Sequence, residues 1–385
     1  MIWTLFKTFF LLGCTSFGGP AAHLGYFRQH FVERLKWVDE AQYAQWIAIS
    51  QVMPGPGSSQ VGFAIGHHQA GIMGGVAAFV GFTLPSVILM CLFAMFGALF
   101  VEAQWFGNVV SALKLMAVVI VADAAIGMYR SFCTSWPLKI AALFGGAFVL
   151  VWPFGLAGLY LVLAAVLLGA LLPSSQRAPL EAQTATSLKP ANLLLLLFFA
   201  LLGLSTLVKD NGVLGMMAEF YQSGSFVFGG GHVVLPLINE FVSSDVSTSQ
   251  VLTGYAAAQA VPGPMFTIAT YLGAISAPAG QSILWALTAT LAIFLPGLLL
   301  MLVGQSYWRF FSRYPRALNA IKYVNAAVVG LLVATLVFPI IPASVTAYWQ
   351  IPVVGVAFVW LQRFKPAIWQ VISVFLVGAI TASLV

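Results

Sequence analysis

The chain contains few charged residues: they make up only 7% of its 385 positions, whereas ordinary soluble domains carry about 25%. So little charge excludes a water-soluble domain with a fully solvated surface. Cysteine is also scarce, and Cys14, Cys91 and Cys133 show no Cys-x-x-Cys spacing. We interpret them as small packing residues rather than as a disulfide framework or a metal site. The first residues lack the small-residue cleavage site of a signal peptide.

Hydrophobic residues, in contrast, make up 61% of the chain and form long uninterrupted runs. A helix needs roughly 20 residues to cross about 30 Å of hydrocarbon. Several runs reach that length, namely Met73–Phe100, Val109–Tyr129, Ala279–Gly304 and Ala317–Phe338. A membrane β-barrel would instead show short segments of alternating polarity. The sequence therefore predicts an all-α polytopic membrane protein.

A polar segment at 173–190, rich in Ser, Thr, Pro and Ala, divides the chain nearly in half, as a linker would. Motifs on its two sides recur in the same order, which indicates an internal repeat. The pairs are Phe17-Gly18-Gly19-Pro20 with Phe228-Gly229-Gly230-Gly231, Gln51-Val52-Met53-Pro54-Gly55-Pro56 with Gln259-Ala260-Val261-Pro262-Gly263-Pro264, Thr83-Leu84-Pro85-Ser86 with Phe294-Leu295-Pro296-Gly297, and Ala112-Leu113-Lys114 with Ala320-Ile321-Lys322.

Lysine and arginine are distributed unequally between equivalent loops. Basic loops of one half correspond to loops without basic residues in the other, and cytoplasmic loops carry the excess of positive charge. The basic loops hold Arg28, Arg34 and Lys36; Arg130 and Lys139; and Arg309, Arg313 and Arg316. Their counterparts lie at Asn239–Thr248, at Pro339–Pro352 and near Glu102. The halves are therefore predicted to have inverted topology in the cytoplasmic (inner) membrane.

This pattern defines four predicted parts. They are a first transport repeat at 1–172, a polar cytoplasmic linker at 173–190, an extra apolar helix at 191–208 and a second, inverted repeat at 209–385. The extra helix would flip the second half, and four full spans would follow the glycine motifs in each half. We expect a cytoplasmic amino terminus and a carboxy terminus outside.

Pro-Gly-Pro interrupts the apolar chain twice, at Pro54-Gly55-Pro56 and at Pro262-Gly263-Pro264. Proline removes a backbone donor and clashes with the preceding helical turn. The preceding piece, Ala41–Met53, would form a helix of about 20 Å, which is too short to cross the membrane. Unsatisfied backbone groups cost several kcal/mol in hydrocarbon, so such breaks persist only where protein or a polar cavity surrounds them. We predict broken, re-entrant helical hairpins at these breaks and at the two glycine motifs.

A helix starts after each break, and its amino end carries partial positive charge and free N–H groups. Four such ends meeting within the membrane would form an anion site made of backbone. The alternative is that the breaks are only packing kinks. The predicted binding residues are Ser16, Phe17, Gly18, Gly19, Pro54, Gly55, Pro56, Gly57, Ser58, Ser59, Gly229, Gly230, Gly231, Pro262, Gly263, Pro264 and Thr267.

Ionisable residues near these motifs are candidates for guiding or coupling the anion. They are Lys114, Lys322, Asp123, Arg28, His23 and His232. The two lysines are repeat equivalents and would act as cationic guides, or else reach the headgroups. The aspartate has no acidic counterpart and would couple protons or pair structurally. We see no metal-ligand spacing, nucleophilic triad, phosphate-binding loop or nucleic-acid motif, so we expect no metal, no cofactor, no nucleic acid and no enzyme.

Four stretches carry a resemblance to a known family: Ser16–Arg28, Ile49–Gly66, Phe226–Leu237 and Ala256–Gly273. In these stretches, and over nearly the whole chain, the sequence resembles the chromate ion transporter (CHR) family in its long, two-domain form. The resemblance implies secondary export of chromate and chromate resistance, with sulfate as a further ligand or competitor.

Three other functions are left open by the residues. They are a carrier of sulfate or another oxyanion, an anion channel with the same helix-end site, and an intramembrane lipid-modifying enzyme. The last would need clustered carboxylates or histidines, which the broken segments largely lack. The expected partners are the transported anion and the lipid bilayer, and a homodimer is left open.

The topology can be tested with single cysteines introduced by Asp245→Cys, Arg34→Cys or Arg313→Cys in a cysteine-free background. An impermeant thiol reagent added outside should label position 245 and miss positions 34 and 313, because basic loops face the cytoplasm. Labelling of positions 245 and 313 from the same side would contradict the inverted second half.

Overall fold

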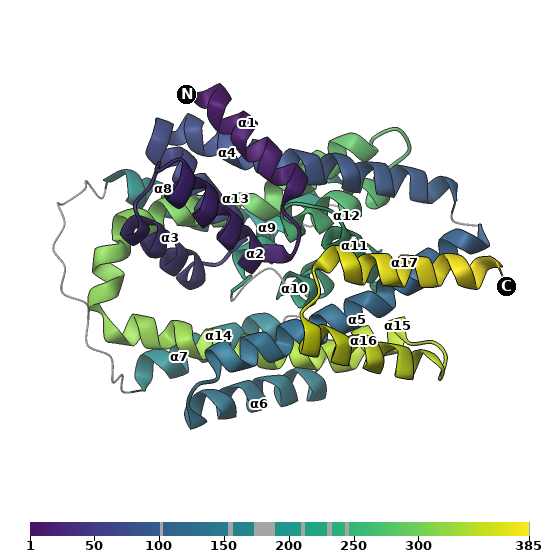
Figure 1. Cartoon of the computed structure of the whole chain (residues 1–385). Helices are drawn as coiled ribbons and strands as arrows, with labels where there is room; N and C mark the ends of the chain where they lie inside the picture. Colours follow the sequence, from purple (N-terminus) through teal and green to yellow (C-terminus); the bar gives the residue numbers. More distant parts are fainter. Residues whose placement is uncertain are drawn as a thin grey trace.

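A computed structural model describes residues 1–100, 103–152, 157–172, 189–208, 212–228, 233–242 and 246–384 of the chain (Figure 1). Over these residues the chain is helical and contains no strand. Long apolar helices qualify by length and composition as membrane spans; they are Gly57–Gly97, Gln104–Phe132, Pro190–Leu207, Ser282–Trp308 and Pro315–Ser344. The prediction of an all-α polytopic membrane protein is confirmed.

The first half consists of short broken helices followed by two long helices and a short pair. Its elements are α1 (Ile2–Thr15), α2 (Gly19–Phe27), the π-helix η1 (Arg28–Arg34), α3 (Glu40–Val52), α4 (Gly57–Leu99), α5 (Gln104–Phe132), α6 (Trp136–Val151) and α7 (Ala157–Leu171).

The second half repeats this order after α8 (Lys189–Leu207). Its elements are α9 (Val213–Ser225), α10 (Val234–Phe241), α11 (Thr248–Ala260), the 3-10 turn η3 (Met265–Thr267), α12 (Ile268–Ser276), α13 (Ser282–Arg313), α14 (Pro315–Thr335), the π-helix η4 (Leu336–Ile340), α15 (Ile341–Ser344), α16 (Gln350–Phe364) and α17 (Ile368–Leu384). The chain order therefore pairs α1 with α9, α2 with α10, α3 with α11, α5 with α14, and the last two helices of each half.

The helices that flank each of the four predicted breaks contact each other. Residues before and after each break are in contact. Three of these contacts are between aromatic rings (Phe9 with Phe27, Trp46 with His68, Phe226 with Phe241), and in the fourth Gly254 lies against the Tyr271 ring. The Pro-Gly-Pro motifs lie at two of these breaks, where α3 ends at Val52 and α11 ends at Ala260. Membrane re-entry of the four hairpins stays a prediction.

The helix α4 is itself two helices joined by a reversal. Ala70 and Gly71 leave the helical conformation, and Gly71 has a positive φ of 62°. On the two sides of this turn, Gly66 and Gly74 approach so closely that a Cβ on either would meet the other's carbonyl oxygen. The first part of α4 therefore returns against the second, as α12 returns against α13 at Gly273.

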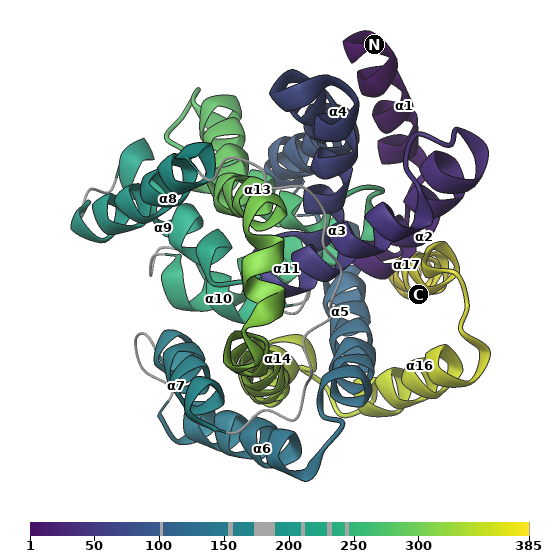
Figure 2. The ribbon, with the colours of Figure 1, turned by 90° about the vertical axis from the view of Figure 1, so that its left-hand side faces the viewer.

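The last two helices of each half pack against the other half. Helices α6 and α7 contact α14, whereas α16 and α17 contact α5 (Figure 2). Close backbone contact at Gly146 and Gly330 lets α6 approach α14, and Asn319 Nδ2 donates to the Gly169 carbonyl at 2.8 Å. Each half thus packs its last two helices on a long helix of the other half, which holds the two halves together. The sequence motifs did not predict this arrangement.

The last two helices of each half are shorter than the full spans expected after the glycine motifs. Helices α6, α7, α16 and α17 contain 16, 15, 15 and 17 residues. At 1.5 Å per residue they reach about 22–26 Å, less than the hydrocarbon thickness of about 30 Å. Each half instead has two long helices followed by a short pair.

The extra helix α8 lies at the edge of the molecule against α9 and α13, with the Tyr307 hydroxyl donating to Asn192 Oδ1. It has no equivalent in the first half, as predicted from the chain order. Its role in inverting the second half stays a prediction. Most of the linker (173–188) and Asp245 lie outside the described residues.

Candidate functional site

Two backbone hydrogen bonds join the halves at the helix breaks. The Gly55 N–H donates to the Val227 carbonyl at 2.8 Å, and the Gly263 N–H donates to the Ser16 carbonyl at 2.9 Å. Val227 precedes the second glycine motif just as Ser16 precedes the first. Each Pro-Gly-Pro therefore binds the hairpin tip of the opposite half, and we call the place where the four tips meet the crossing.

Further hydrogen bonds fix the proline carbonyls at the crossing. Ser86 Oγ, on α4, donates to the Pro262 carbonyl at 2.7 Å. Gln60 Nε2 donates to the Pro54 carbonyl at 3.0 Å and to the Gly297 carbonyl, on α13, at 2.9 Å. Ser86 and Gly297 are equivalent positions of the repeat, so each break rests on the long helix of the other half.

The glycines of the two Pro-Gly-Pro motifs are required by this packing. Gly55 and Gly263 have φ of +129° and +102°, which side chains rarely adopt. A Cβ on Gly55 would lie 2.6 Å from Gly297 Cα, and one on Gly263 would overlap Ser86 Oγ. Carbonyls of the opposite half accept the N–H groups of Gly55 and Gly263, and the anion-binding role of these two glycines stays a prediction.

His23 connects the two hairpins of the first half. It is fully buried; its Nε2 lies 3.2 Å from the Ser16 carbonyl and its Nδ1 lies 3.3 Å from Ser58 Oγ. Because a carbonyl only accepts, Nε2 carries the hydrogen, and a neutral ring then accepts from the Ser58 hydroxyl at Nδ1. His23 thus positions the crossing, and its ring packs edge-on against Phe82.

Three hydroxyls on the elements of the crossing are buried without a hydrogen-bond partner among the described residues. They belong to Ser16, Ser59 and Thr83, whose residues are 1%, 2% and 3% exposed. A buried donor that lacks an acceptor destabilises the fold by about 1–3 kcal/mol, so these hydroxyls are positions where a water molecule or a polar ligand would be stabilised. At the start of α4, the N–H groups of Gly57, Ser58 and Ser59 also have no acceptor in the described part of the chain.

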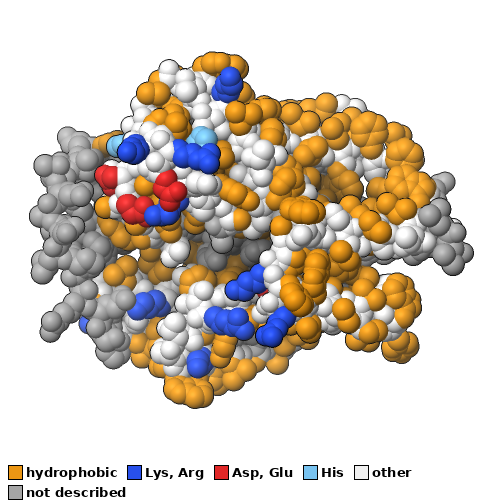
Figure 3. Space-filling view, in the orientation of Figure 1, with side chains coloured by type: hydrophobic (Ala, Val, Ile, Leu, Met, Phe, Trp, Pro, Cys, Tyr) orange, Lys and Arg blue, Asp and Glu red, His pale blue; other side chains and the backbone are white. Residues whose placement is uncertain are grey.

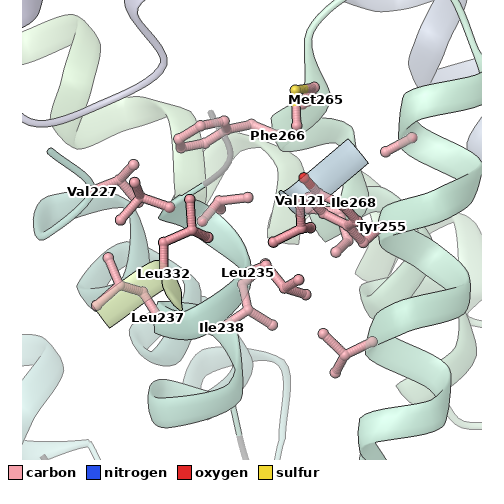
Figure 4. Packing of buried hydrophobic residues seen from close by; sticks show 14 of the residues in the cluster. Val121, Val227, Leu235, Leu237, Ile238, Tyr255, Met265, Phe266, Ile268 and Leu332 are labelled. Atoms are coloured by element: carbon pink, nitrogen blue, oxygen red, sulfur yellow. The ribbon is translucent and has the colours of Figure 1, made fainter. Parts of the chain in front are cut away.

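The side of the crossing contributed by the second half is apolar. Figure 4 shows Val227, Tyr255, Met265, Phe266 and Ile268 packed together. The Thr267 hydroxyl is used within its own turn, where it donates to the Pro264 carbonyl at 2.8 Å. Gly229, Gly230, Gly231 and His232 lie outside the described residues. Among the described residues of the four hairpins, the buried hydroxyls without a partner therefore belong to the first half.

The first glycine motif reaches the surface, whereas both Pro-Gly-Pro motifs are buried. Gly18 is exposed, Phe17 and Gly57 are half-buried, and Pro262–Thr270 is buried throughout. Gly19 is buried against Met265 Sδ. Figure 3 shows a hollow between the surface over α2 and α3 and the surface over α5 and α14, with Lys and Arg side chains on both rims and Asp and Glu side chains beside those of the upper rim.

The other charged candidates lie away from the crossing. Lys114 Nζ donates to Ser249 Oγ at 2.5 Å, and Lys322 is exposed with no hydrogen bond or ion pair among the described residues. Asp123 Oδ1 accepts from Gln362 Nε2 at 2.8 Å, which ties α5 to α16.

Arg28 pairs with Glu33 at 2.6 Å and with Glu40 at 2.9 Å. Its hydrogen bond to Glu40 is the main cause that raises the pKa of Arg28. Both ion pairs are exposed and therefore belong to the surface rather than to the crossing.

The sequence missed Gln60, Thr83, Ser86 and Gly297 as site residues. The last three belong to the repeated motif of the long helices, so the repeat had marked the motif without assigning it a role. This motif contacts the Pro-Gly-Pro of the other half, and local sequence patterns cannot reveal such a tertiary contact.

The architecture is that of a membrane protein built from two repeats whose broken helices meet inside the fold. The chain matches the chromate transporter family twice, over residues 3–170 and 214–382, and it belongs to that family. The resemblance noted in the sequence is thereby confirmed.

Similar proteins include chromate transport proteins of several bacteria. The chain is 28% identical to a probable chromate transport protein of Synechococcus elongatus, covering 86% of this chain and 83% of the other. It is 26% identical to the chromate transport protein of Cupriavidus metallidurans, covering 86% and 80%. The protein of Pseudomonas aeruginosa is 28% identical, covering 86% and 79%. No solved structure matches the chain.

The close contact at the crossing can be tested with four alanine variants. Gly55→Ala and Gly263→Ala should each lose about 1–3 kcal/mol through overpacking, in addition to the strain of a positive φ. Gly71→Ala carries only the φ strain, and Gly107→Ala carries neither, because a Cβ at either position meets open space. The thermal midpoint of the detergent-solubilised protein should therefore fall most for Gly55→Ala and Gly263→Ala. Equal midpoints for Gly55→Ala, Gly263→Ala and Gly71→Ala would contradict the packing.

Proposed function

We propose that this protein is a secondary transporter that exports chromate across the cytoplasmic membrane and thereby confers chromate resistance. Membership of the chromate transporter family supports the substrate, as do the relatives named chromate transport proteins. The observation that carries the mechanism is the crossing, where four broken hairpins meet beside buried donors without partners.

The donors at the crossing suit a tetrahedral oxyanion. Chromate presents four oxygens and two negative charges, and its oxygens accept hydrogen bonds. The hydroxyls of Ser16, Ser59 and Thr83 are buried donors, and the N–H groups of Gly57–Ser59 open a helix whose amino end favours anions. Sulfate has the same shape and charge, so the same donors would bind sulfate, and sulfate would compete with chromate.

The route to the donors also favours a dianion. Because the first glycine motif reaches the surface at Gly18 and Lys and Arg side chains lie on both rims of the hollow, chromate would enter from this side. By the positive-inside rule that side is the cytoplasm. Charge would concentrate the anion there, and the neutral crossing would hold it through hydrogen bonds.

Export requires a driving force, and the membrane potential supplies one. Moving one elementary charge through 100 mV is worth about 2.3 kcal/mol, so expelling a dianion from a negative interior gains roughly twice that amount. The sequence contains no nucleotide-binding motif, which is consistent with secondary transport. Proton coupling is not required by this arithmetic.

Alternating access follows from the repeat. Two halves with inverted topology contain the same elements in opposite orientations, so exchanging their conformations exposes a central site first to one side and then to the other. The motifs, the order of the elements and the paired hydrogen bonds at the crossing support this proposal.

Flux into proteoliposomes tests the binding residues. We expect Ser16→Ala and Ser59→Ala each to raise the chromate concentration for half-maximal flux about tenfold to a hundredfold. This follows because a hydrogen bond to a charged group is worth about 1.5–3 kcal/mol. The concentration of sulfate that inhibits by half should rise by the same factor. Ser373→Ala, at an exposed position on α17, is the matched control and should leave both values unchanged.

Three results would contradict parts of this proposal. Unchanged half-saturation in both serine variants would remove the crossing as the binding site. Sulfate flux far above chromate flux in the unmodified protein would make sulfate the substrate. Loss of counterflow, together with flux that does not saturate, would indicate a channel rather than a carrier.

A further inference from the structure

The two halves pack unequally around the crossing. Helix α11 packs against α5, and α10 packs against α7 and α14. The equivalent contacts would join α3 with α14, and α2 with α17 and α5, yet these helix pairs, all of them described, show no packing of comparable extent. Figure 3 shows the hollow between these same elements. The molecule is therefore closed at the α5–α11 contact and open between α3 and α14.

The equivalent lysines follow this asymmetry. Lys114 is half-buried and donates to Ser249 in the first turn of α11. Lys322, its repeat equivalent on α14, is exposed and makes no hydrogen bond or ion pair to the described residues. The same side chain is thus engaged on the closed side and disengaged on the open side.

The position that corresponds to Ser249 can be read from the helix starts. Asp39 begins α3 by accepting from the Gln42 N–H, and Ser247 begins α11 by accepting from the Gln250 N–H. Ser249 therefore corresponds to Ala41, and the neighbour of Ala41 on the amino-terminal side is Glu40. A lysine brought to this turn would meet a carboxylate, which also suits the positive end of the helix.

We propose that Lys114 and Lys322 are the latches of two alternating gates, and that the inner gate closes when Lys322 binds Glu40 in the first turn of α3. The structure is then the inward-open state, with the outer gate latched by Lys114 on Ser249. This proposal rests on the alternating access proposed above. It adds the residues that hold each state.

Glu40 forms an ion pair with Arg28 that it could give up for one with Lys322. In the open state its carboxylate accepts from Arg28 Nε at 2.9 Å, and the Arg28 and Glu40 side chains are 49% and 58% exposed. Exposed ion pairs contribute little stability and form and break readily. Arg28 also keeps a second carboxylate, that of Glu33 at 2.6 Å, so it would not be left unpaired when Glu40 moves to Lys322.

The two gates differ in chemistry. Ser249 is neutral, so the outer latch is a single hydrogen bond from an ammonium placed at the amino end of a helix, where positive charge is disfavoured. The inner latch pairs opposite charges. Neutralising Glu40 should therefore favour the inward-open state, whereas removing the Ser249 hydroxyl should favour the outward-open state.

Cross-linking tests the gates without any measurement of transport. In a cysteine-free background, a short bis-methanethiosulfonate reagent is applied to two cysteine pairs, Lys114→Cys with Ser249→Cys and Ala41→Cys with Lys322→Cys. A reagent with a spacer is needed because lysine reaches across a wider gap than a disulfide tolerates. Both pairs should cross-link, although only the first is close in this structure. A cross-link in the first pair should leave a third cysteine, placed by Glu40→Cys, reactive to thiol reagents.

Ile321 supplies the matched control, since it neighbours Lys322 but points about 100° away around α14. The pair of Ala41→Cys with Ile321→Cys should cross-link at least fivefold more slowly than the pair with Lys322→Cys. Equal rates for the two pairs, or no cross-link in either, would overturn the inner gate.

Charge exchange provides a second, independent measurement. Lys322→Glu should increase the labelling of a cysteine placed at Ala41, because two carboxylates would then hold the gate open. Glu40→Lys combined with Lys322→Glu should restore the original labelling rate. Failure of the exchanged pair to restore it would contradict the latch.

These results are separable from those on transport. Cross-links of the predicted pattern in a protein without chromate flux would leave the gates in place and reject the proposed substrate. Normal chromate flux without the inner cross-link would reject this inference and leave the transport function intact.

Discussion

The fold depends on the satisfaction of backbone groups where its helices break. Proline and glycine free N–H and C=O groups inside an apolar protein, and each would cost several kcal/mol if it stayed unpaired. At the crossing, Gly55 and Gly263 donate to carbonyls of the opposite half, and the carbonyls of Pro54 and Pro262 accept from side chains. Each half therefore supplies hydrogen-bond partners that the broken helices of the other half need. Neither half alone would satisfy the backbone groups at its breaks.

After these hydrogen bonds between the halves have formed, a few buried donors still have no acceptor among the described residues. Hydroxyls of Ser16, Ser59 and Thr83 and the first N–H groups of α4 remain without partners in the described chain, whereas the second half fills its side with apolar residues. A site of neutral donors suits an anion that must bind and then leave. A lysine at the crossing would hold a dianion far more tightly and slow its release. In our proposal the cations instead lie on the route of the anion and at the gates.

The sequence predicted those features that depend on local backbone chemistry. The breaks, the short flanking helices and the repeat are visible because Pro-Gly-Pro and the glycine motifs restrict the backbone wherever they occur. The acceptors of the Gly55 and Gly263 N–H groups could not be predicted from the sequence, because they lie in the other half. The exchange of α6 and α7 onto α14 was also missed, since uniformly apolar helices do not indicate which neighbour they contact.

At the candidate site, too, the sequence predicted residues that adjoin the motifs but not the contacts that these residues make. Ser16, Ser58, Ser59 and His23 were found because they adjoin the motifs, and the structure brings all four to the crossing. Lys114 and Lys322 were found by their repeat positions, but their different environments emerge only from the unequal packing of the halves. A sequence pattern does not show which conformation the protein adopts, so the gates could be proposed only from the structure.

The central claim, that the anion binds at the crossing, is tested most directly by hydrogen–deuterium exchange with and without chromate. In lipid nanodiscs, chromate should slow exchange in peptides covering residues 53–60, because the N–H groups of Gly57–Ser59 would gain an acceptor. Peptides covering α6, at residues 136–151, should exchange at the same rate in both conditions. Unchanged exchange at 53–60 under saturating chromate, with protection elsewhere in the chain, would contradict the account.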